Sequence, residues 1–527
     1  MQKNLRGLLE ERAAASPEKV FLVNEADGRE YTYRAFDRAV DRTARLLASL
    51  GVSKGDAVSL LLPNGAEYVV AYFACFKLGA LAGPVNSLLK PEELSFVVSD
   101  SGAKALLYGS EFAEQVAQVR AAASALAHAV AFDYEPRDTA EFDGPHDGTG
   151  VDPWRATEIV PEDEAVIIYT SGTTGRPKGC LLTHANLVAN ARQIVEWLNF
   201  TADDRLLTVM PLFHMNAVTV TTASALYAGG STIVAPRFSA KRFWQTVAEG
   251  GATSFGSVAT MLSMLLARYP EGVPEGLDVS RLRFAMCGSA PVPAEVLRRF
   301  ERTFGCLVVE GYGLSESTCR STFNPPDERR RPGSCGLPIG NEMRVVDEED
   351  RELPDGEQGE IVLRGENVFK GYFRNEEATR RAFRGGWFHT GDVGYRDREG
   401  FFYIVDRKSD MIIRGGENIY PREIDELLYR HPAVAEAAAF GVPDELYGEE
   451  VAACVVIKAG AAASGEEVAA YCREHLADYK CPKVVHVVER LPKGPTGKVL
   501  KRELAKLYRG GGEPAATTLS GVTDGGA

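Results

Sequence analysis

Short apolar runs alternate with amphipathic helical patterns along the first 330 residues, and this alternation strongly limits the folds open to the chain. Strands are predicted at 57–62, 165–169, 206–210, 232–235, 283–287 and 307–310. Helices are predicted at 66–78, 185–198, 240–249, 259–268 and 294–304. Strands that alternate with helices form largely parallel sheets with helices on their faces. We therefore predict an α/β fold, and we expect Asn64 to cap the helix at 66–78.

The length of the chain predicts more than one domain, because 527 residues exceed the roughly 250–300 at which a single core stops growing. Residues 336–405 change to short strands separated by turn-rich acidic segments. We therefore expect a small β subdomain at 335–406 within a large N-terminal domain of layered α/β subdomains at 1–406. A smaller, mobile α+β domain is predicted at 407–509, and a flexible tail at 510–527.

Charge and composition exclude several functions. The net charge of −14 argues against general nucleic-acid binding, which depends on lysine and arginine side chains that neutralise phosphates. No apolar run approaches the roughly 20 residues that a membrane-spanning helix needs, and the N-terminus lacks the apolar core of a signal peptide. Nine cysteines without a CxxC pair are typical of reduced thiols, so we expect a cytoplasmic protein without a membrane span.

A loop rich in glycine and hydroxyl residues gives the strongest indication of function. Residues 169–179 read YTSGTTGRPKG, after a predicted buried strand and before a helix that starts near His184. Glycines let backbone N–H groups turn inward and hydroxyls add donors, so such a loop can wrap a polyphosphate. Lys178 adds a point charge. The spacing differs from the GxxxxGK[ST] motif of P-loop NTPases, so we do not expect their mechanism.

At these residues the sequence resembles the adenylate-forming superfamily, which includes acyl-CoA synthetases, luciferases and the adenylation domains of peptide synthetases. Its other motifs follow in the expected order, with GYGLSES at 311–317, WFHTGDVG at 387–394 and PKGPTGK at 492–498. The resemblance implies an ATP-dependent acyl-CoA ligase that uses ATP, Mg²⁺ and CoA. Its expected partners are a small carboxylic acid, ATP and CoA, with no nucleic acid. The oligomeric state stays open, with a homodimer as one expectation.

The resemblance also assigns a nucleotide site. By resemblance, Glu316 and Thr170 ligate Mg²⁺, a hard cation that takes few protein oxygens and binds phosphate. Tyr312 is expected to cover the adenine, Asp392 to accept both ribose hydroxyls, and Arg407 to reach the ribose. The other nucleotide-binding residues implied are Ser171, Gly172, Thr173, Thr174, Gly175, Lys178, Gly288, Ser289, Ala290, Pro291, Gly311, Gly313 and Ser315, the last in place of the usual threonine.

The resemblance places the remaining chemistry in the C-terminal part. Lys498 is implied as the catalytic lysine that offsets charge when the substrate carboxylate meets the α-phosphate. Ser409 stands at the expected hinge, where relatives most often carry aspartate or lysine. Gly415, Gly416 and Glu417 resemble the loop that lines the pantetheine tunnel of CoA-using members. Rotation about the hinge would then exchange Lys498 for this loop.

The acyl pocket is expected to be apolar. By resemblance, Phe213 and His214 border the acyl site and the thiol tunnel, and His214 is a further catalytic candidate. Amino-acid-activating relatives usually carry an aspartate just after this aromatic, so His214 argues against an amino-acid substrate. The expected substrate-binding residues are Phe213, His214, Val218, Val258, Gly288 and Gly313. This set predicts a medium-chain, long-chain, alicyclic or aryl acid. A dicarboxylate would need a cation, for which Arg320 is the only candidate just after Glu316.

Two other functions stay open at this stage. One is an adenylating enzyme that passes its product to a carrier-protein thiol or to another acceptor. The other is a catalytically inactive nucleotide sensor, which would be expected to lose Lys498 or Glu316. Both residues are present.

Overall fold

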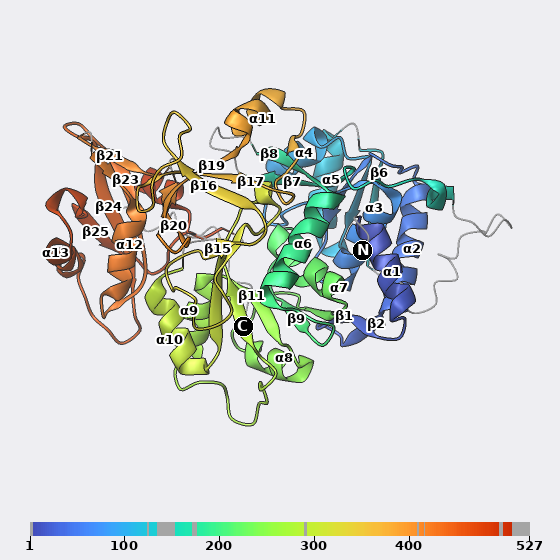
Figure 1. Ribbon diagram of the computed structural model, residues 1–527, viewed down its shortest axis with the longest axis horizontal. Coiled ribbons are helices and arrows are strands. Elements are labelled where there is room, and N and C mark those ends of the chain that lie inside the picture. The colour runs from blue at the N-terminus through green and yellow to red at the C-terminus, as the bar shows by residue number, and fades with distance from the viewer. Residues whose placement is uncertain are drawn as a thin grey trace.

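The computed structural model of the chain describes residues 4–123, 126–133, 153–170, 177–288, 292–407, 410–415, 417–494 and 499–508. Figure 1 shows a large N-terminal domain and a smaller C-terminal domain at one end, drawn in orange and red. The predicted α/β class is confirmed.

A nine-stranded sheet forms one half of the large domain. Its six central strands, from β13 to β1, run parallel, and the short strands at its two ends pair antiparallel. In spatial order the strands are β15 (Leu337–Pro338), β14 (Thr322–Phe323), β13 (Leu307–Tyr312), β12 (Phe284–Cys287), β11 (Ser254–Ser257), β9 (Arg205–Thr208), β10 (Ser231–Val234), β1 (Val20–Asn24) and β2 (Arg29–Thr32).

A seven-stranded sheet forms the other half. In spatial order it contains β18 (Gly371–Tyr372), β8 (Lys178–Thr183), β7 (Glu164–Thr170), β4 (Leu81–Pro84), β3 (Ala57–Leu61), β5 (Ala105–Tyr108) and β6 (His128–Ala131). The strands from β7 to β6 are parallel, whereas β8 and β18 pair antiparallel. β7 and β8 form a hairpin, and its loop is the phosphate-type loop predicted from the sequence.

Helices separate and cover the two sheets. Alternate residues of one strand face opposite sides, so Leu206 joins the core shared by both sheets while Leu207 joins the core on the outer face. The shared core contains α1 (Leu5–Ala15), α2 (Tyr33–Ser49), α3 (Ala66–Leu78) and α6 (His184–Leu198), with α7 (Ser224–Ala228). The outer face of the nine-stranded sheet carries α8 (Phe243–Gly250), α9 (Ala259–Arg268) and α10 (Ala294–Phe304). The outer face of the seven-stranded sheet carries α4 (Pro91–Asp100) and α5 (Ala113–Ala122).

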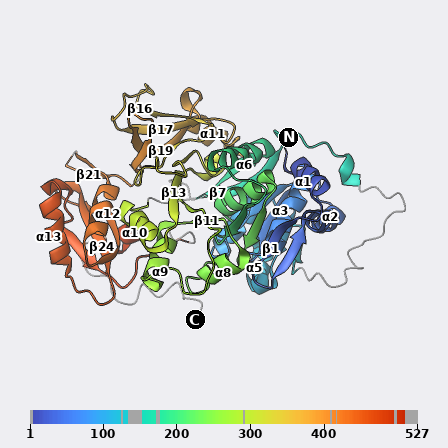
Figure 2. The same cartoon turned by 60° about the horizontal axis from the view of Figure 1, so that its bottom comes forward.

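Two smaller sheets complete the chain. One contains β16 (Glu342–Val346), β17 (Gly359–Arg364), β19 (Phe388–Arg396) and β20 (Phe402–Arg407), with α11 (Glu376–Ala382) nearby. The C-terminal domain contains β21 (Ile412–Arg414), β22 (Glu417–Ile419), β23 (Val434–Asp444), β24 (Gly448–Ile457) and β25 (Val484–Val487), with α12 (Pro421–Arg430), α13 (Gly465–His475) and α14 (Lys501–Leu507). Figures 1 and 2 both show α12 beside α10, so the C-terminal domain lies against the outer helices of the nine-stranded sheet.

Two differences between the structure and the sequence predictions bear on the site. Asn64 does not cap α3: its side-chain amide donates to the carbonyls of Met210 and Ala235, and its oxygen accepts from Leu212 N at 2.8 Å. Asn64 therefore ties the start of α3 to the segment after β9. The stretch expected as one small β subdomain also supplies β15 and β18 to the two large sheets.

All the cysteines agree with the expectation of free thiols. All nine cysteines fall in the described part of the chain, and each is a buried free thiol. No helix in the described ranges is long and apolar enough to cross a membrane.

Candidate active site

The candidate site lies where three parallel strands of the nine-stranded sheet end. In the register of β11, β12 and β13, Ser257 is opposite Cys287, and Cys287 is opposite Glu310. The residues that follow these strands therefore gather at one edge, which is where open α/β sheets usually bind ligands. A cavity of about 460 Å³ opens there, lined by Val258 and by the segment from Gly311 to Gly313.

Asp392 joins this edge to the small β sheet. Its Oδ2 accepts a hydrogen bond from the hydroxyl of Tyr312 at 2.5 Å, and its Oδ1 lies 3.0 Å from Nε of Arg407. Asp392 and Arg407 face each other on the paired strands β19 and β20. The Asp392 carboxylate raises the pKa of Arg407, while burial and then Asp392 raise the pKa of Tyr312 far above its usual value. The three residues therefore form one anchored polar group on the cavity wall.

Glu316 and Thr170 converge on the buried thiol of Cys180. Thr170 Oγ1 lies 3.7 Å from Cys180 Sγ, and burial together with the charge of Glu316 raises the pKa of that thiol. Within the described part of the chain, no cluster of three or more histidine, cysteine or acidic side chains could hold a metal. One carboxylate and one hydroxyl nevertheless fit Mg²⁺, which takes few protein ligands and completes its shell with water and phosphate.

Tyr372 is a member of this group that sequence reasoning missed. It lies opposite Cys180 in the β8–β18 pair, and its hydroxyl donates to Glu316 Oε1 at 3.1 Å. The ammonium of Lys178 lies 5.2 Å from the centre of the Tyr372 ring, within the range of a cation–π contact. Tyr372 therefore orients the carboxylate and the lysine together. In the sequence, only the position of Tyr372 in the GYF segment after Lys370 could have indicated this role.

The predicted acyl-side residues follow β9. The rings of Phe213 and His214 lie 4.6 Å apart; Phe213 is buried and His214 is half-buried. Burial lowers the pKa of His214 to about 4, and its Nε2 has no hydrogen-bond partner among the described residues. Val218 lies in the π-helical segment Asn216–Ala223, a distortion that often occurs at functional sites. His214 is thus a neutral imidazole at pH 7.

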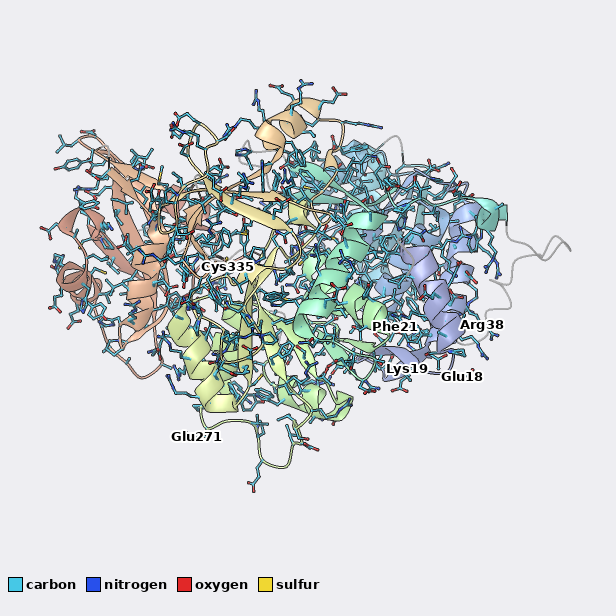
Figure 3. The ribbon with its side chains drawn as sticks, in the orientation of Figure 1. Glu18, Lys19, Phe21, Arg38, Glu271 and Cys335 are labelled. Carbon is cyan, nitrogen blue, oxygen red and sulfur yellow. The ribbon has the colours of Figure 1, made fainter. Side chains whose placement is uncertain are left out.

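The cavity also contains two buried groups that are not nucleophiles at neutral pH. Figure 3 shows Cys335 in the interior of the molecule, and burial raises the pKa of this thiol to about 12. Glu310 is buried on the same wall, and burial raises its pKa to about 8. Both groups therefore carry their protons over most of the neutral range.

The C-terminal domain closes the cavity from the other side. Five successive residues, from Val499 to Glu503, line it together with Asp392. Lys501 forms an ion pair of 2.6 Å with Asp425, and Val499 forms a backbone bridge with Lys493. That bridge fixes the base of the loop between residues 493 and 499 next to the nucleotide-side wall.

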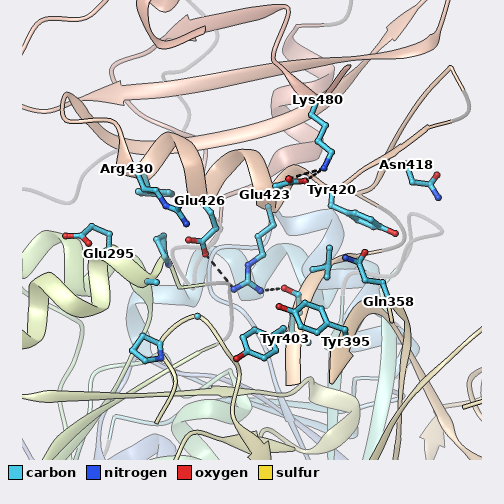
Figure 4. A pocket seen from close by; sticks show the side chains of 18 of the residues that line it. Glu295, Gln358, Tyr395, Tyr403, Asn418, Tyr420, Glu423, Glu426, Arg430 and Lys480 are labelled. Carbon is cyan, nitrogen blue, oxygen red and sulfur yellow. Dashed lines mark hydrogen bonds and ion pairs between the residues drawn. The ribbon is translucent and has the colours of Figure 1, made fainter. Parts of the chain in front are cut away.

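A second cavity of about 720 Å³ lies between the two domains (Figure 4). The rings of Tyr395 and Tyr403 stack at 4.7 Å on the N-terminal side. On the C-terminal side, Lys480 pairs with Glu423 at 2.7 Å, and Asn418 also lines the space. An interface that is polar and incompletely filled is typical of domains that move relative to each other.

The structure describes some of the predicted site residues, and the others lie outside the described ranges. Gly415 sits at the tip of the β21–β22 hairpin with φ +60°, and its N–H donates to Tyr447 O at 2.9 Å. Glu417 begins β22, and Ser315 begins a short 3₁₀ turn that contains Glu316. The predicted residues outside the described ranges are Ser171, Gly172, Thr173, Thr174, Gly175, Ser289, Ala290, Pro291, Ser409, Gly416 and Lys498.

Comparisons with known proteins agree with this geometry. The AMP-binding enzyme family matches residues 9–373, and the AMP-binding enzyme C-terminal domain matches residues 423–498. The chain is 37% identical to a sulfoacetate–CoA ligase of Cupriavidus necator, over 95% of this chain and 97% of that protein. It is 36% identical to a long-chain-fatty-acid–CoA ligase of Mycobacterium tuberculosis, over 96% of this chain and 99% of that protein.

Two solved structures of one protein match this chain to different extents. ATP-bound MatB from Rhodopseudomonas palustris matches with a TM-score of 0.87, at 32% identity over 97% of this chain and 99% of that one. The apo form of the same protein matches with the same identity and coverage but a TM-score of 0.77. The present arrangement of the chain is therefore more similar to the ATP-bound form.

Proposed function

Because this chain belongs to the AMP-binding enzyme family, we propose that the site described above carries out both half-reactions of an AMP-forming acyl-CoA ligase. The chain is an ATP-dependent acid–thiol ligase, and its substrates are a carboxylic acid, ATP and CoA. The roles of individual residues are our inference. The observation that carries it is the Tyr312–Asp392–Arg407 group, which lies on the same cavity as residues 499–503 of the C-terminal domain.

In the first half-reaction, Asp392 and Arg407 hold the ribose while the loop between Thr170 and Lys178 holds the phosphates. A carboxylate oxygen of the acid attacks the α-phosphorus, a new O–P bond forms, and the bond to the β-phosphate oxygen breaks. The products are acyl-adenylate and pyrophosphate. Lys498 offsets the charge of the two anions as they meet, a contribution that depends on positioning and electrostatics. In support, the neighbouring Val499 lines the same cavity as Asp392.

Glu316 and Thr170 are the residues that would hold Mg²⁺. Bound there, the ion would stabilise negative charge on the phosphate oxygens. Tyr372 positions the Glu316 carboxylate through its hydroxyl, and Cys180 stays protonated beside it because its pKa is raised.

In the second half-reaction, the C-terminal domain rotates about Ser409, so that the Gly415–Glu417 hairpin replaces Lys498. The CoA sulfur attacks the acyl carbon, the bond between that carbon and the AMP oxygen breaks, and the thiol proton is lost to solvent. The polar cavity between the domains supports such a motion. The difference between the two MatB comparisons supports assigning the present arrangement to adenylation.

The acid is inferred from the walls of the acyl side. Phe213, Val218 and Val258 are buried and apolar, and His214 is neutral at pH 7, so the part of the acid that passes them is hydrophobic. Family membership leaves the far end of the acid open. The two curated relatives described above are named for sulfoacetate and for long-chain fatty acids, which differ strongly at that end.

Acid-dependent exchange of pyrophosphate into ATP tests the first half-reaction, and formation of a CoA thioester tests the second. Exchange together with thioester formation is the expected result. Pyrophosphate exchange without CoA thioester formation from any acid would indicate that the acceptor is a carrier-protein thiol. Absence of exchange with a broad panel of acids would contradict the adenylation itself. A cytoplasmic location and a homodimeric state remain predictions.

A further inference from the structure

Arg320 is a buried cation for which the described residues supply no counter-charge. Its side chain is 1% exposed, and neither Nε nor Nη2 has a hydrogen-bond partner in the described ranges. No acid among these residues forms an ion pair with it, and Ser289, Ala290 and Pro291, which follow its neighbour Gly288, carry no acid. Removal of a guanidinium from water without a counter-charge is costly, so such a buried site needs an explanation.

The protein holds Arg320 in place through its backbone and its ring neighbour. Asn190 accepts from Arg320 N at 3.1 Å and donates to Arg320 O at 2.6 Å, and Asn367 donates to the same carbonyl at 3.1 Å. The guanidinium carbon lies 5.4 Å from the centre of the Phe323 ring. These contacts hold the backbone of Arg320 and one face of its guanidinium, and no described residue accepts from the Nε–Nη2 edge.

That guanidinium lies at the strand edge that forms the candidate site. A Cβ at Gly288 would stand 2.8 Å from Nη2 of Arg320 and 2.5 Å from Gly311 O, so only glycine leaves room for the guanidinium there. Gly288 follows β12, and Gly311 lines the 460 Å³ cavity. The guanidinium therefore lies next to Gly288, which is expected to border both the nucleotide and the acid, whereas the ribose and metal groups are built around Asp392 and Glu316.

We propose that Arg320 binds a second anionic group, a carboxylate or a sulfonate, at the far end of the acid that this enzyme activates. The inference rests on the proposed function and names its substrate class: an acid with an apolar middle and a negative charge at each end. Nε and Nη2 form one planar edge of the guanidinium, and two parallel N–H donors match two oxygens of a carboxylate. Binding of the acid supplies the counter-charge that the described residues lack.

Pairs of acids that differ only at the far end test the proposal. The pairs are propionate with malonate, butyrate with succinate, valerate with glutarate, and hexanoate with adipate, each measured by pyrophosphate exchange and CoA thioester formation. We expect kcat/KM to favour the diacid at one chain length by at least about 100-fold, as expected when the analogue leaves a buried charge unpaired. The sulfonate analogue of the preferred diacid should also react.

Two variants of Arg320 and one control separate recognition from folding. Arg320→Met keeps an unbranched stem but removes the guanidinium, and it should lower kcat/KM for the diacid by about 100-fold, with little change for the monoacid. Arg320→Lys keeps the charge but not the planar edge, so it should retain part of the preference. The control is Arg268→Met, which removes an exposed arginine that also lies over a tyrosine ring. Without acid, Arg320→Met should unfold at the same temperature as the wild type or higher, because it removes an unpaired buried charge.

The opposite results have distinct meanings. Equal use of monoacids and diacids at every length overturns the inference and leaves the proposed function intact. The inference is also overturned, and the proposed function left intact, if Arg320→Met unfolds at a lower temperature and its kcat/KM falls equally for the monoacid and the diacid. The arginine would then have a structural role. Exchange that prefers a diacid to its monoacid, but without a CoA thioester, contradicts the proposed acceptor and still supports Arg320. No exchange with any acid contradicts both.

Discussion

The hydroxyl of Tyr312 donates a hydrogen bond to Asp392 Oδ2 across 2.5 Å, although the two residues are 80 positions apart in the sequence. Tyr312 ends a strand of the nine-stranded sheet, whereas Asp392 lies on β19 of the small sheet. Burial and the Asp392 charge raise the pKa of Tyr312, so the phenol stays a donor throughout the working range of pH. This bond therefore fixes the expected ribose-binding carboxylate relative to the strand ends.

Tyr312→Phe tests that relationship. The variant keeps the ring and loses one hydrogen bond to a charged acceptor, a contribution of about 1.5–3 kcal/mol. We expect KM for ATP to rise about tenfold or more, with a smaller effect on kcat, in steady-state kinetics with saturating acid. Tyr269→Phe, which removes a bond from Tyr269 Oη to Lys241 O, is the matched control. An unchanged KM for ATP would show that Asp392 needs no help from Tyr312.

Asp392→Asn removes the charge and keeps the shape of the side chain. Arg407 then loses the carboxylate 3.0 Å away that raises its pKa, and the ribose keeps only one of the two expected acceptor oxygens. We expect kcat/KM for ATP to fall by about 10- to 100-fold in the exchange assay, because a hydrogen bond to a charged acceptor contributes about 1.5–3 kcal/mol. Asp355→Asn removes an exposed aspartate that pairs with Arg396 at 2.7 Å and should have little effect. A loss of the same size in both variants would contradict a special role for Asp392.

Much of the large domain was predictable because its elements are set by local periodicity. The helices predicted at 66–78, 259–268 and 294–304 match α3, α9 and α10 at both ends. The two-residue strands β14, β15 and β18 were not predicted, because so short a segment carries no periodic signal. Their pairing depends on residues far away in the chain, as when Tyr372 meets Cys180.

The site was predictable as a list of residue types but not as a set of contacts. Motifs identified Glu316, Asp392 and Arg407, whose chemistry can be inferred from resemblance. They could not show that Tyr372 orients Glu316, because that bond joins residues 56 positions apart. Arg320 was the only candidate cation just after Glu316 in the sequence, but the surroundings of its Nε–Nη2 edge depend on which side chains the fold brings near it.

We expect Glu310→Gln to change the stability of the protein in a way that depends on pH. Burial raises the pKa of Glu310 from 4.5 to about 8, so between these values the folded state holds a proton that the unfolded state has lost. The stability of the wild type should therefore fall as pH rises from about 4.5 to 8, by at most about 1.4 kcal/mol for each pH unit. Glutamine needs no proton, so the variant should gain stability over the wild type at pH 8 and not at pH 4.5, in thermal unfolding.

The control for Glu310 is an acid on the surface of the same domain. Glu295→Gln removes a carboxylate that is 47% exposed and should give nearly the same difference in melting temperature at both pH values. Equal melting-temperature changes for Glu310→Gln at pH 4.5 and pH 8 would contradict the raised pKa.

His214 should behave as a neutral group in catalysis. Burial lowers its pKa to about 4, so the folded state resists a proton that the unfolded state takes up below about pH 6.5. Wild-type stability should thus fall as pH drops from about 6.5 towards 4, and His214→Gln should lose less stability over that range. Between pH 6 and 8 the rate profiles of the two proteins should be parallel. A change in the wild-type rate centred near pH 6.5 that is absent from His214→Gln would show that His214 titrates during turnover.

Lys498→Ala separates the two half-reactions. The substitution removes the cation expected between the substrate carboxylate and the α-phosphate, and loss of one such electrostatic group costs about 10²–10³ in kcat. Exchange of pyrophosphate should therefore fall by about that factor. CoA thioester formation from a supplied acyl-adenylate should continue, because the domain rotation would remove Lys498 from the site at that step. Lys493→Ala is the matched control from the same loop, since Lys493 already pairs with Glu436 at 2.6 Å. Undiminished exchange in Lys498→Ala, or an equal loss in both half-reactions, would contradict the assigned role.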